Sequence, residues 1–237
     1  MNRPNRSQIY SALSNWHDYG LLSQTREIFL ESGDDGLGSK HAVEFIKNLT
    51  MLESLNNNPI IIHQYNIGGD QNAGFAIYDA IRASKCKFLF ICYGSASSMG
   101  SIIPQAVIGK GLRVTHPHTE WLIHEGSCET SGTTKQFISN AEALKKSKET
   151  MYDIYVSACK KGSAFKGKKP VEIKSILKRR LNVKEDWILD GERAVEYGFA
   201  DVLFGKGQNS SIENILKRLL HSVFVLKLIL FLQVFYL

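Results

Sequence analysis

The chain has 237 residues, of which 43% are hydrophobic and 22% are charged, and its formal net charge at pH 7 is +6. This length fits one domain with a sizeable core, and the composition excludes a disordered or fibrous protein. Much of the basic surplus lies between Lys145 and Lys184 without interleaved aromatic residues. We interpret it as a solvated helix face, and we expect no binding to nucleic acid.

The first half of the chain alternates between predicted helices and predicted strands. Helices are expected where apolar residues recur every three or four positions, and strands where short apolar runs follow turn residues. The expected helices are 8–24, 41–55 and 73–83, and the expected strands are 26–31, 59–63 and 88–92. A loop is expected at 33–38 and a tight turn of small residues at 93–99.

The second half continues the same alternation. Strands are expected at 113–115 and 121–124, and helices at 137–159, 171–180 and 190–198. A short helix is expected after residue 98, and Pro104 should kink it or remove a hydrogen bond. Strands that alternate with helices predict an α/β fold with a largely parallel sheet.

The cysteines argue against disulfides and metal binding. The chain has four, Cys86, Cys92, Cys128 and Cys159, and none is part of a Cys-x-x-Cys pair. Cys86 and Cys92 lie in or beside an apolar run, so we expect reduced thiols in the core. This pattern suits a reducing compartment such as the cytoplasm or an organellar stroma or matrix.

The two ends of the chain differ in character. Residues 1–10 are polar and are not expected to be a signal peptide. Residues 219–237 carry one formal charge, Lys227, and just reach the length of about 20 residues that a membrane span needs. A membrane anchor, a strand or helix packed on the protein, and an exposed sticky strand are the alternatives. We expect deletion of 219–237 to improve solubility and to spare activity.

Ser98 is the first candidate for chemistry. It follows an apolar strand within the run Gly94–Gly100, whose small residues permit a sharp turn that exposes the hydroxyl at the start of a helix. The free N–H groups at a helix N-terminus favour a developing oxyanion. The alternative is a turn that serves packing alone.

Gly68 and Gly69 form the second candidate, directly after the strand at 59–63. Glycines allow close approach of the backbone to a ligand. The N–H of Gly68 together with that of Met99 could hold a tetrahedral oxyanion. The alternative is an ordinary turn.

His124 and Asp186 complete the set of candidates. His124 ends an apolar strand and could act as a base, or it could be a core histidine with its hydrogen bonds satisfied. Asp186 could orient an imidazole, with Glu185 as its neighbouring competitor. His116 and His118 flank a proline and make a poor zinc site, so no metal is expected.

These motifs stand in an order that resembles the proteolytic subunit of the Clp protease, the ClpP family. The resemblance spans about residues 9–204. It implies a ClpP/crotonase-like fold, a spiral of β-β-α units with a protruding handle helix at 137–159. The matching stretches are Gly68-Gly69, Ala73-Gly74, Ile77-Tyr78-Asp79, Ala96–Gly100, Gly109–Arg113, Pro117, Ile123-His124, Ala194–Gly198 and Asp201.

The resemblance implies a serine endopeptidase with a triad of Ser98, His124 and Asp186. It places the oxyanion hole at the amides of Gly68 and Met99. It also implies that substrate lies as an added strand along a groove. The residues expected to bind substrate are Gly69, Glu125 and Gly126.

The family's partners follow from the same resemblance. The chain should assemble with itself into a tetradecamer of two stacked heptameric rings, and an AAA+ unfoldase of the Clp type should feed it unfolded polypeptide. No cofactor is expected in this chain, because ATP would bind the unfoldase. The expected division is an N-terminal segment and first helix at 1–24, a serine peptidase domain at 25–206, and an apolar tail at 207–237 that could contact a membrane.

Several positions depart from the family pattern. Ile67 replaces a proline before the two glycines, Gly126 replaces a proline after the histidine, and His63 replaces a tyrosine of the docking cleft. Three alternatives therefore stay open. They are a non-catalytic ring subunit of a mixed barrel, an acyl-CoA enzyme of the crotonase type, and a phage capsid-maturation peptidase of the same fold.

Overall fold

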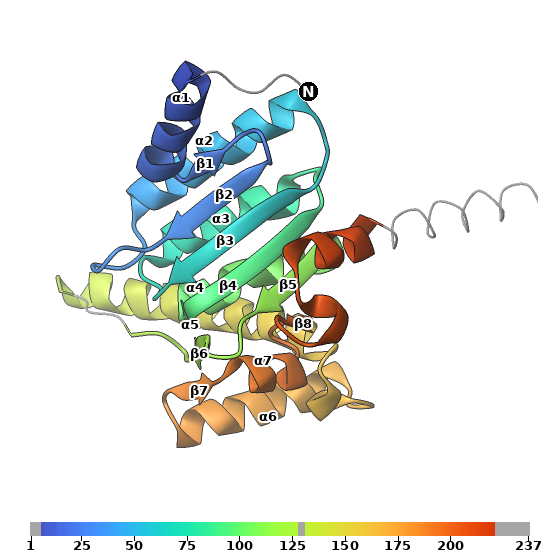
Figure 1. Ribbon diagram of the computed structural model, residues 1–237. Coiled ribbons are helices and arrows are strands. Elements are labelled where there is room, and N and C mark those ends of the chain that lie inside the picture. Colours follow the sequence, from blue (N-terminus) through green and yellow to red (C-terminus); the bar gives the residue numbers. More distant parts are fainter. Residues whose placement is uncertain (1–5, 128–130, 221–237) are drawn as a thin grey trace, which may run out of the picture.

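The computed structural model describes residues 6–127 and 131–220 as an α/β domain (Figure 1). Six strands of one sheet lie in the order β1-β2-β3-β4-β5-β8, while β6 pairs with β4 and β7 pairs with β6. The neighbouring strands from β2 to β5 pair in parallel, and so do β5 with β8 and β4 with β6. The alternation of strands and helices predicts this. The strands are β1 Leu21–Leu22, β2 Glu27–Glu31, β3 Ile60–Asn66, β4 Phe88–Ser97, β5 Gly111–Thr115, β6 Glu120–Ile123, β7 Trp187–Leu189 and β8 Val202–Leu203.

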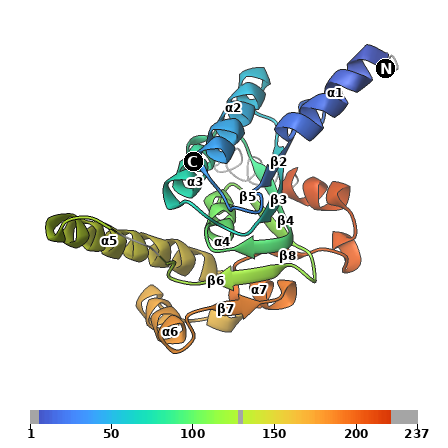
Figure 2. The same cartoon turned by 90° about the vertical axis from the view of Figure 1, so that its left-hand side faces the viewer.

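The helices flank this sheet, and one of them projects from it. The N-terminal half of α5 extends away from the body with Phe137 and Ile138 exposed (Figure 2). This is the handle-like helix that the resemblance implies. The helices are α1 Arg6–Tyr19, α2 Ser39–Leu55, α3 Gln71–Ala83, α4 Met99–Ile102, α5 Thr134–Cys159, α6 Pro170–Val183 and α7 Gly191–Tyr197, with 3₁₀ turns at Ile103–Val107, Ser163–Phe165 and Gly207–Asn209.

Strand β4 is longer than the sequence predicts, and this length positions Ser98. A tight turn was expected from residue 93, but the strand continues through Ser97. Its first half pairs with β3 and β5, and its last three residues pair with β6. The turn is confined to Ser98, and the helix after it is interrupted at Pro104 by a 3₁₀ turn, as expected.

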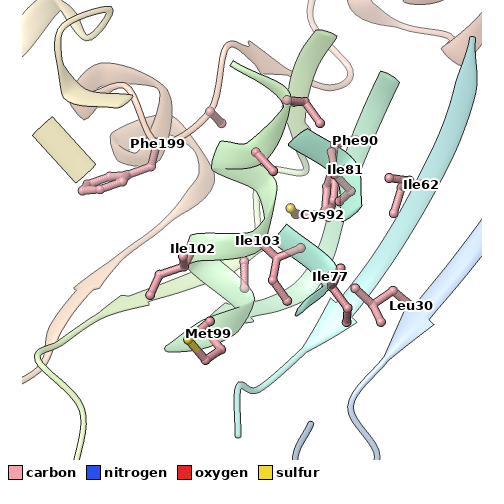
Figure 3. Packing of buried hydrophobic residues seen from close by; sticks show 14 of the residues in the cluster. Leu30, Ile62, Ile77, Ile81, Phe90, Cys92, Met99, Ile102, Ile103 and Phe199 are labelled. Atoms are coloured by element: carbon pink, nitrogen blue, oxygen red, sulfur yellow. The ribbon is translucent and has the colours of Figure 1, made fainter. Parts of the chain in front are cut away.

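The core lies on both faces of the sheet, as is usual for buried parallel strands. On one face Ile62 and Phe90 pack against Ile77 and Ile81 of α3 (Figure 3). Cys86 and Cys92 are free and buried, which confirms their prediction as core thiols. The smaller cluster on the other face comprises Ile61, Leu89, Ile91, Val114, Val202, Ile215 and Leu219.

The last described residues belong to the fold. Residues 212–220 are helical, and their Ile215 and Leu219 are buried against the sheet. A deletion that begins at residue 219 would therefore remove a buried side chain. No helix within the described ranges is long and apolar enough to cross a membrane. The predicted anchor falls mainly on 221–237, outside the described residues.

We expect Leu219→Ala to lower the free energy of unfolding by about 2 kcal/mol, because it removes buried methyl groups from the smaller cluster. Urea-induced unfolding at a fixed protein concentration measures this loss. The exposed Leu220 offers a matched control, since Leu220→Ala should change the stability by less than about 0.5 kcal/mol. Equal effects of the two variants would show that the helix does not pack on the sheet.

A buried ion pair joins β5 to the turn between α7 and β8. Arg113 is fully buried and its guanidinium contacts both carboxylate oxygens of Asp201 at 2.9 and 2.7 Å. The Arg113 guanidinium also donates to the carbonyl oxygen of Gly198 at 2.9 Å. The pair fixes the turn between α7 and β8 against the sheet.

Candidate active site

Ser98 lies at the end of β4 in a strained conformation. Its φ of 53° and ψ of −122° are rare for a residue with a side chain, and such strain often accompanies function. Its N–H donates to the carbonyl oxygen of Leu122 at 2.9 Å, and its carbonyl oxygen accepts from Ser101 Oγ at 2.6 Å. The turn is therefore held from both sides, and it presents the hydroxyl at the start of α4.

The Ser98 hydroxyl contacts His124. Ser98 Oγ lies 2.7 Å from His124 Nε2, which is the distance of a strong hydrogen bond. His124 follows β6 directly, and β6 pairs in parallel with the last residues of β4. This pairing is the reason that two residues 26 positions apart meet. The imidazole can accept the serine proton at this geometry.

Asp186 faces the other nitrogen of the imidazole. The antiparallel pairing of β6 with β7 places Ile123 opposite Trp187, so His124 and Asp186 meet at the adjoining ends of the two strands. Asp186 Oδ1 lies 3.4 Å from His124 Nδ1, and the Asp186 side chain is 56% exposed. The contact suits a carboxylate that orients the imidazole, although it is longer and more exposed to solvent than a buried hydrogen bond.

The two glycines differ in what their N–H groups do. Gly68 N–H donates to Asn66 Oδ1 at 2.8 Å, so it is already used. This contradicts the prediction that Gly68 supplies a free amide to the oxyanion hole. Gly68 is still required to be glycine, because a Cβ there would lie 2.5 Å from Ser98 Cβ.

Gly69 takes the place expected for Gly68. Within the described residues its N–H has no acceptor, and it lines the cavity at Ser98 together with Met99. Met99 is the first residue of α4, where an N–H has no acceptor inside the helix. Leu37 fixes the loop, since its N–H donates to Gly68 O at 2.6 Å and its carbonyl accepts from Asp70 N–H. The amides of Gly69 and Met99 are therefore the candidate oxyanion donors.

A cavity of about 290 Å³ opens beside Ser98. Apolar side chains from α3, α4 and α5 line part of its wall, and polar residues, among them Gln71, Ser147 and Lys148, line the rest. A larger cavity of about 510 Å³ lies between α6 and β7, but Ser98 does not line it. The smaller cavity is the one that can receive a side chain beside the hydroxyl. The apolar wall residues are Phe75, Ile102, Leu144 and Met151.

Comparison with known proteins shows the family of the chain. The family model of the Clp protease matches residues 11–206. The chain belongs to the Clp protease family. It is 30% identical to the ATP-dependent Clp protease proteolytic subunit of Deinococcus radiodurans over 184 residues, 77% of this chain and 82% of the relative. It is 28% identical to proteolytic subunit 2 of Pseudomonas aeruginosa over 78% of this chain and 82% of the relative. It is 29% identical to proteolytic subunit 1 of Chlamydia trachomatis serovar D over 79% of this chain and 90% of the relative.

The chain is thus a divergent ClpP family member with the ClpP fold, and the segment after His124 shows the divergence. Gly126 has a φ of 84° and open space where a Cβ would stand. The backbone of residues 124–127 makes no hydrogen bond to other described backbone, so its edge is open to an extended peptide.

Glu125 lines the cavity at Ser98, and its side chain is paired with residues of α5. Its carboxylate contacts the Tyr152 hydroxyl and the Lys148 ammonium, both on α5. Burial alone would raise the pKa of Glu125, but these two partners outweigh it and hold the pKa below its ordinary value. The carboxylate is therefore ionised and paired on α5, and its role as a substrate contact stays a prediction.

Several residues of this ClpP site escaped sequence reasoning. Asn66 and Ser101 hold the glycine loop and the Ser98 turn, and Tyr152 and Lys148 hold Glu125. Tyr152 lies 27 positions from Glu125 in sequence, and the hydrogen bonds of Asn66 and Ser101 depend on side-chain conformation. Residue spacing reveals neither. Within residues 6–127 and 131–220, no group of three His, Cys, Asp or Glu side chains could hold a metal ion.

Proposed function

We propose that this chain is a serine endopeptidase, the proteolytic subunit of a barrel-shaped ATP-dependent protease that hydrolyses peptide bonds of unfolded proteins. The observation that carries the proposal is the 2.7 Å contact between Ser98 Oγ and His124 Nε2 at a strained strand-to-helix turn. A purely structural turn has no need of a strained serine that touches an imidazole.

The mechanism follows from the atoms in contact. His124 Nε2 accepts the Ser98 proton as Oγ attacks the peptide carbonyl carbon, and Asp186 stabilises the imidazolium that forms. The N–H groups of Gly69 and Met99 stabilise the oxyanion. His124 then protonates the leaving amine, and a water molecule repeats the sequence to release the acyl group from Ser98.

The substrate lies extended along the open backbone edge of residues 124–127 and along Gly69, with one side chain in the cavity beside Ser98. The apolar residues Phe75, Ile102, Leu144 and Met151 in this cavity favour an apolar side chain at the position before the cleaved bond. The rest of the groove binds the backbone of the substrate through backbone hydrogen bonds, so the cleavage preference is broad.

The assembly is part of the proposal. The relatives bear names that describe ATP-dependent Clp protease subunits. We infer that this chain forms two stacked heptameric rings, that exposed Phe137 and Ile138 on the projecting half of α5 join the rings, and that a Clp-type AAA+ unfoldase supplies unfolded chains. The unfoldase, and not this chain, would bind ATP.

A second candidate is the non-catalytic subunit of a mixed barrel. The observation that favours it is the exposure of Asp186 together with its 3.4 Å distance from the imidazole. The acyl-CoA enzyme of the crotonase type is disfavoured, because it would leave the contact between Ser98 and His124 without a role.

The test is peptide hydrolysis by the purified, assembled chain. We expect a short fluorogenic peptide with leucine or methionine before the cleaved bond to be hydrolysed without ATP, and a folded protein to resist. Light scattering coupled to gel filtration gives the mass of the assembly. An assembled chain that hydrolyses no peptide, alone or with a Clp ATPase, would favour the non-catalytic subunit.

A further inference from the structure

The segment 124–127, which carries His124 away from β6, lacks backbone hydrogen bonds to the described residues. Residues 124–127 have no regular structure and no hydrogen bond to described backbone. Gly126 adds conformational freedom, since its φ is 84° and nothing surrounds the position of a Cβ. A general base must stay within hydrogen-bond reach of the hydroxyl, so this segment needs an anchor.

Glu125 supplies an anchor directly beside His124. Its carboxylate accepts a hydrogen bond from the Tyr152 hydroxyl and pairs with the Lys148 ammonium. The Tyr152 side chain is fully buried, whereas the Glu125 and Lys148 side chains are 25% and 40% exposed. The tyrosine hydroxyl is thus a fixed point inside the fold, to which the backbone of residues 124–127 is tied by the Glu125 side chain.

The anchor is itself braced by α6. The Lys178 ammonium lies 5.2 Å above the Tyr152 ring and pairs with Glu149 of α5 at 2.6 Å. Lys174, also on α6, pairs with the same Glu149 at 2.9 Å. Two helices therefore hold the tyrosine that holds Glu125.

We propose that Glu125 is a positioning residue for His124, acting through Tyr152 and Lys148, and that it replaces the rigidity that the backbone of residues 124–127 lacks. The inference rests on the proposed peptidase function and deepens it. Glu125 does not touch the reacting atoms. It limits the movement of the neighbouring His124, whose ring must face Ser98 Oγ.

The occupancy of the carboxylate separates this role from substrate binding. A residue that recognises substrate presents an unpaired polar group to the groove, but both oxygens of Glu125 already have partners on α5. Loss of these partners should therefore change the alignment of His124 and leave the affinity for peptide nearly unchanged.

The test compares Tyr152→Phe, Glu125→Gln and Glu125→Ala with the wild-type chain. We expect Glu125→Ala to lower kcat by about tenfold or more with KM within about twofold, because misplaced catalytic groups lower the rate rather than the binding. Glu125→Gln should lose less, since its amide oxygen still accepts from Tyr152. Tyr152→Phe removes one oxygen atom from a packed ring and serves as the mildest probe of the anchor.

Labelling with a small fluorophosphonate that has no peptide part gives the second readout. Its rate reports the reactivity of Ser98 without contacts along the groove, and it should fall in parallel with kcat. Glu213→Gln is the matched control, because it makes the same change of charge in an exposed pair with Lys217, outside the anchor and its brace, and should leave both rates unchanged. Far-UV circular dichroism and the assembled mass confirm that each variant folds.

Three results would overturn the inference. A raised KM with unchanged kcat and unchanged labelling would make Glu125 a substrate contact. Unchanged kinetics in all three variants would show that the anchor is not needed. A wild-type chain that labels no better than Ser98→Ala would reject the proposed function, and the inference with it.

Discussion

Replacing Ser98 by alanine is expected to lower kcat for peptide hydrolysis by about 10⁶-fold, to the level left by binding and the oxyanion donors alone. The loss is large because the variant removes the atom that forms the acyl intermediate. His124→Ala should lose nearly as much, and the double variant should lose little more, because the two residues act as one unit. Steady-state hydrolysis of a short fluorogenic peptide by the three variants measures these losses.

Asp186→Asn provides the graded member of this series. The Asp186 side chain of the wild type is 56% exposed and 3.4 Å from the imidazole, so water also stabilises the imidazolium and weakens the effect of the carboxylate. We expect a loss in kcat of about 10²-fold, smaller than the about 10⁴-fold that accompanies a buried triad aspartate.

Two results would contradict the shared mechanism of Ser98 and His124. Additive losses of Ser98→Ala and His124→Ala would show that the two residues act independently, and an unchanged kcat in Ser98→Ala would show that Ser98 takes no part in the chemistry.

The largest expected effect on stability comes from Asp201. We expect Asp201→Ala to lower the free energy of unfolding by about 3–5 kcal/mol, because it leaves the fully buried guanidinium of Arg113 without its counter-charge. Urea-induced unfolding at pH 7 measures the loss. Asp153→Ala is the matched control, since it breaks an exposed pair with Lys174 and should cost less than about 1 kcal/mol. Equal losses for the two variants would contradict a structural role for the buried pair.

The same pair predicts a dependence on pH. Burial alone would raise the pKa of Asp201, but the hydrogen bonds and charge of Arg113 outweigh it and hold the pKa below its ordinary value. A carboxyl group with a lowered pKa stabilises the fold above its unfolded pKa of about 3.9, and this contribution is lost as the pH falls through the folded pKa. The difference in stability between wild type and Asp201→Ala should therefore be constant above about pH 5 and shrink below about pH 4.

The sequence was sufficient for the features that depend on local pattern. The long helix after residue 134, the buried run Ile60–Ile62 and the sharp turn at Ser98 all follow from the spacing of apolar and small residues. The order of four short motifs indicated the family. Such features need no knowledge of which strands pair.

Features that depend on pairing or on single side chains were missed. Strand β7 has three residues and exposes Ile188, so its apolar pattern is too short to recognise, although its pairing with β6 brings Asp186 to His124. Gly68 was predicted to be an oxyanion donor, because residue spacing cannot show that its N–H already donates to Asn66 Oδ1. The anchoring of Glu125 by Tyr152 likewise joins residues 27 positions apart in sequence.

The most direct test of the central claim is labelling of the purified, assembled chain with a fluorophosphonate probe, followed by intact mass and peptide mapping. A serine that is activated by His124 reacts with the probe, whereas an ordinary serine does not. The account predicts one adduct per chain, on Ser98, and none in Ser98→Ala. An assembled wild-type chain without an adduct, or an adduct on a different residue, would contradict it.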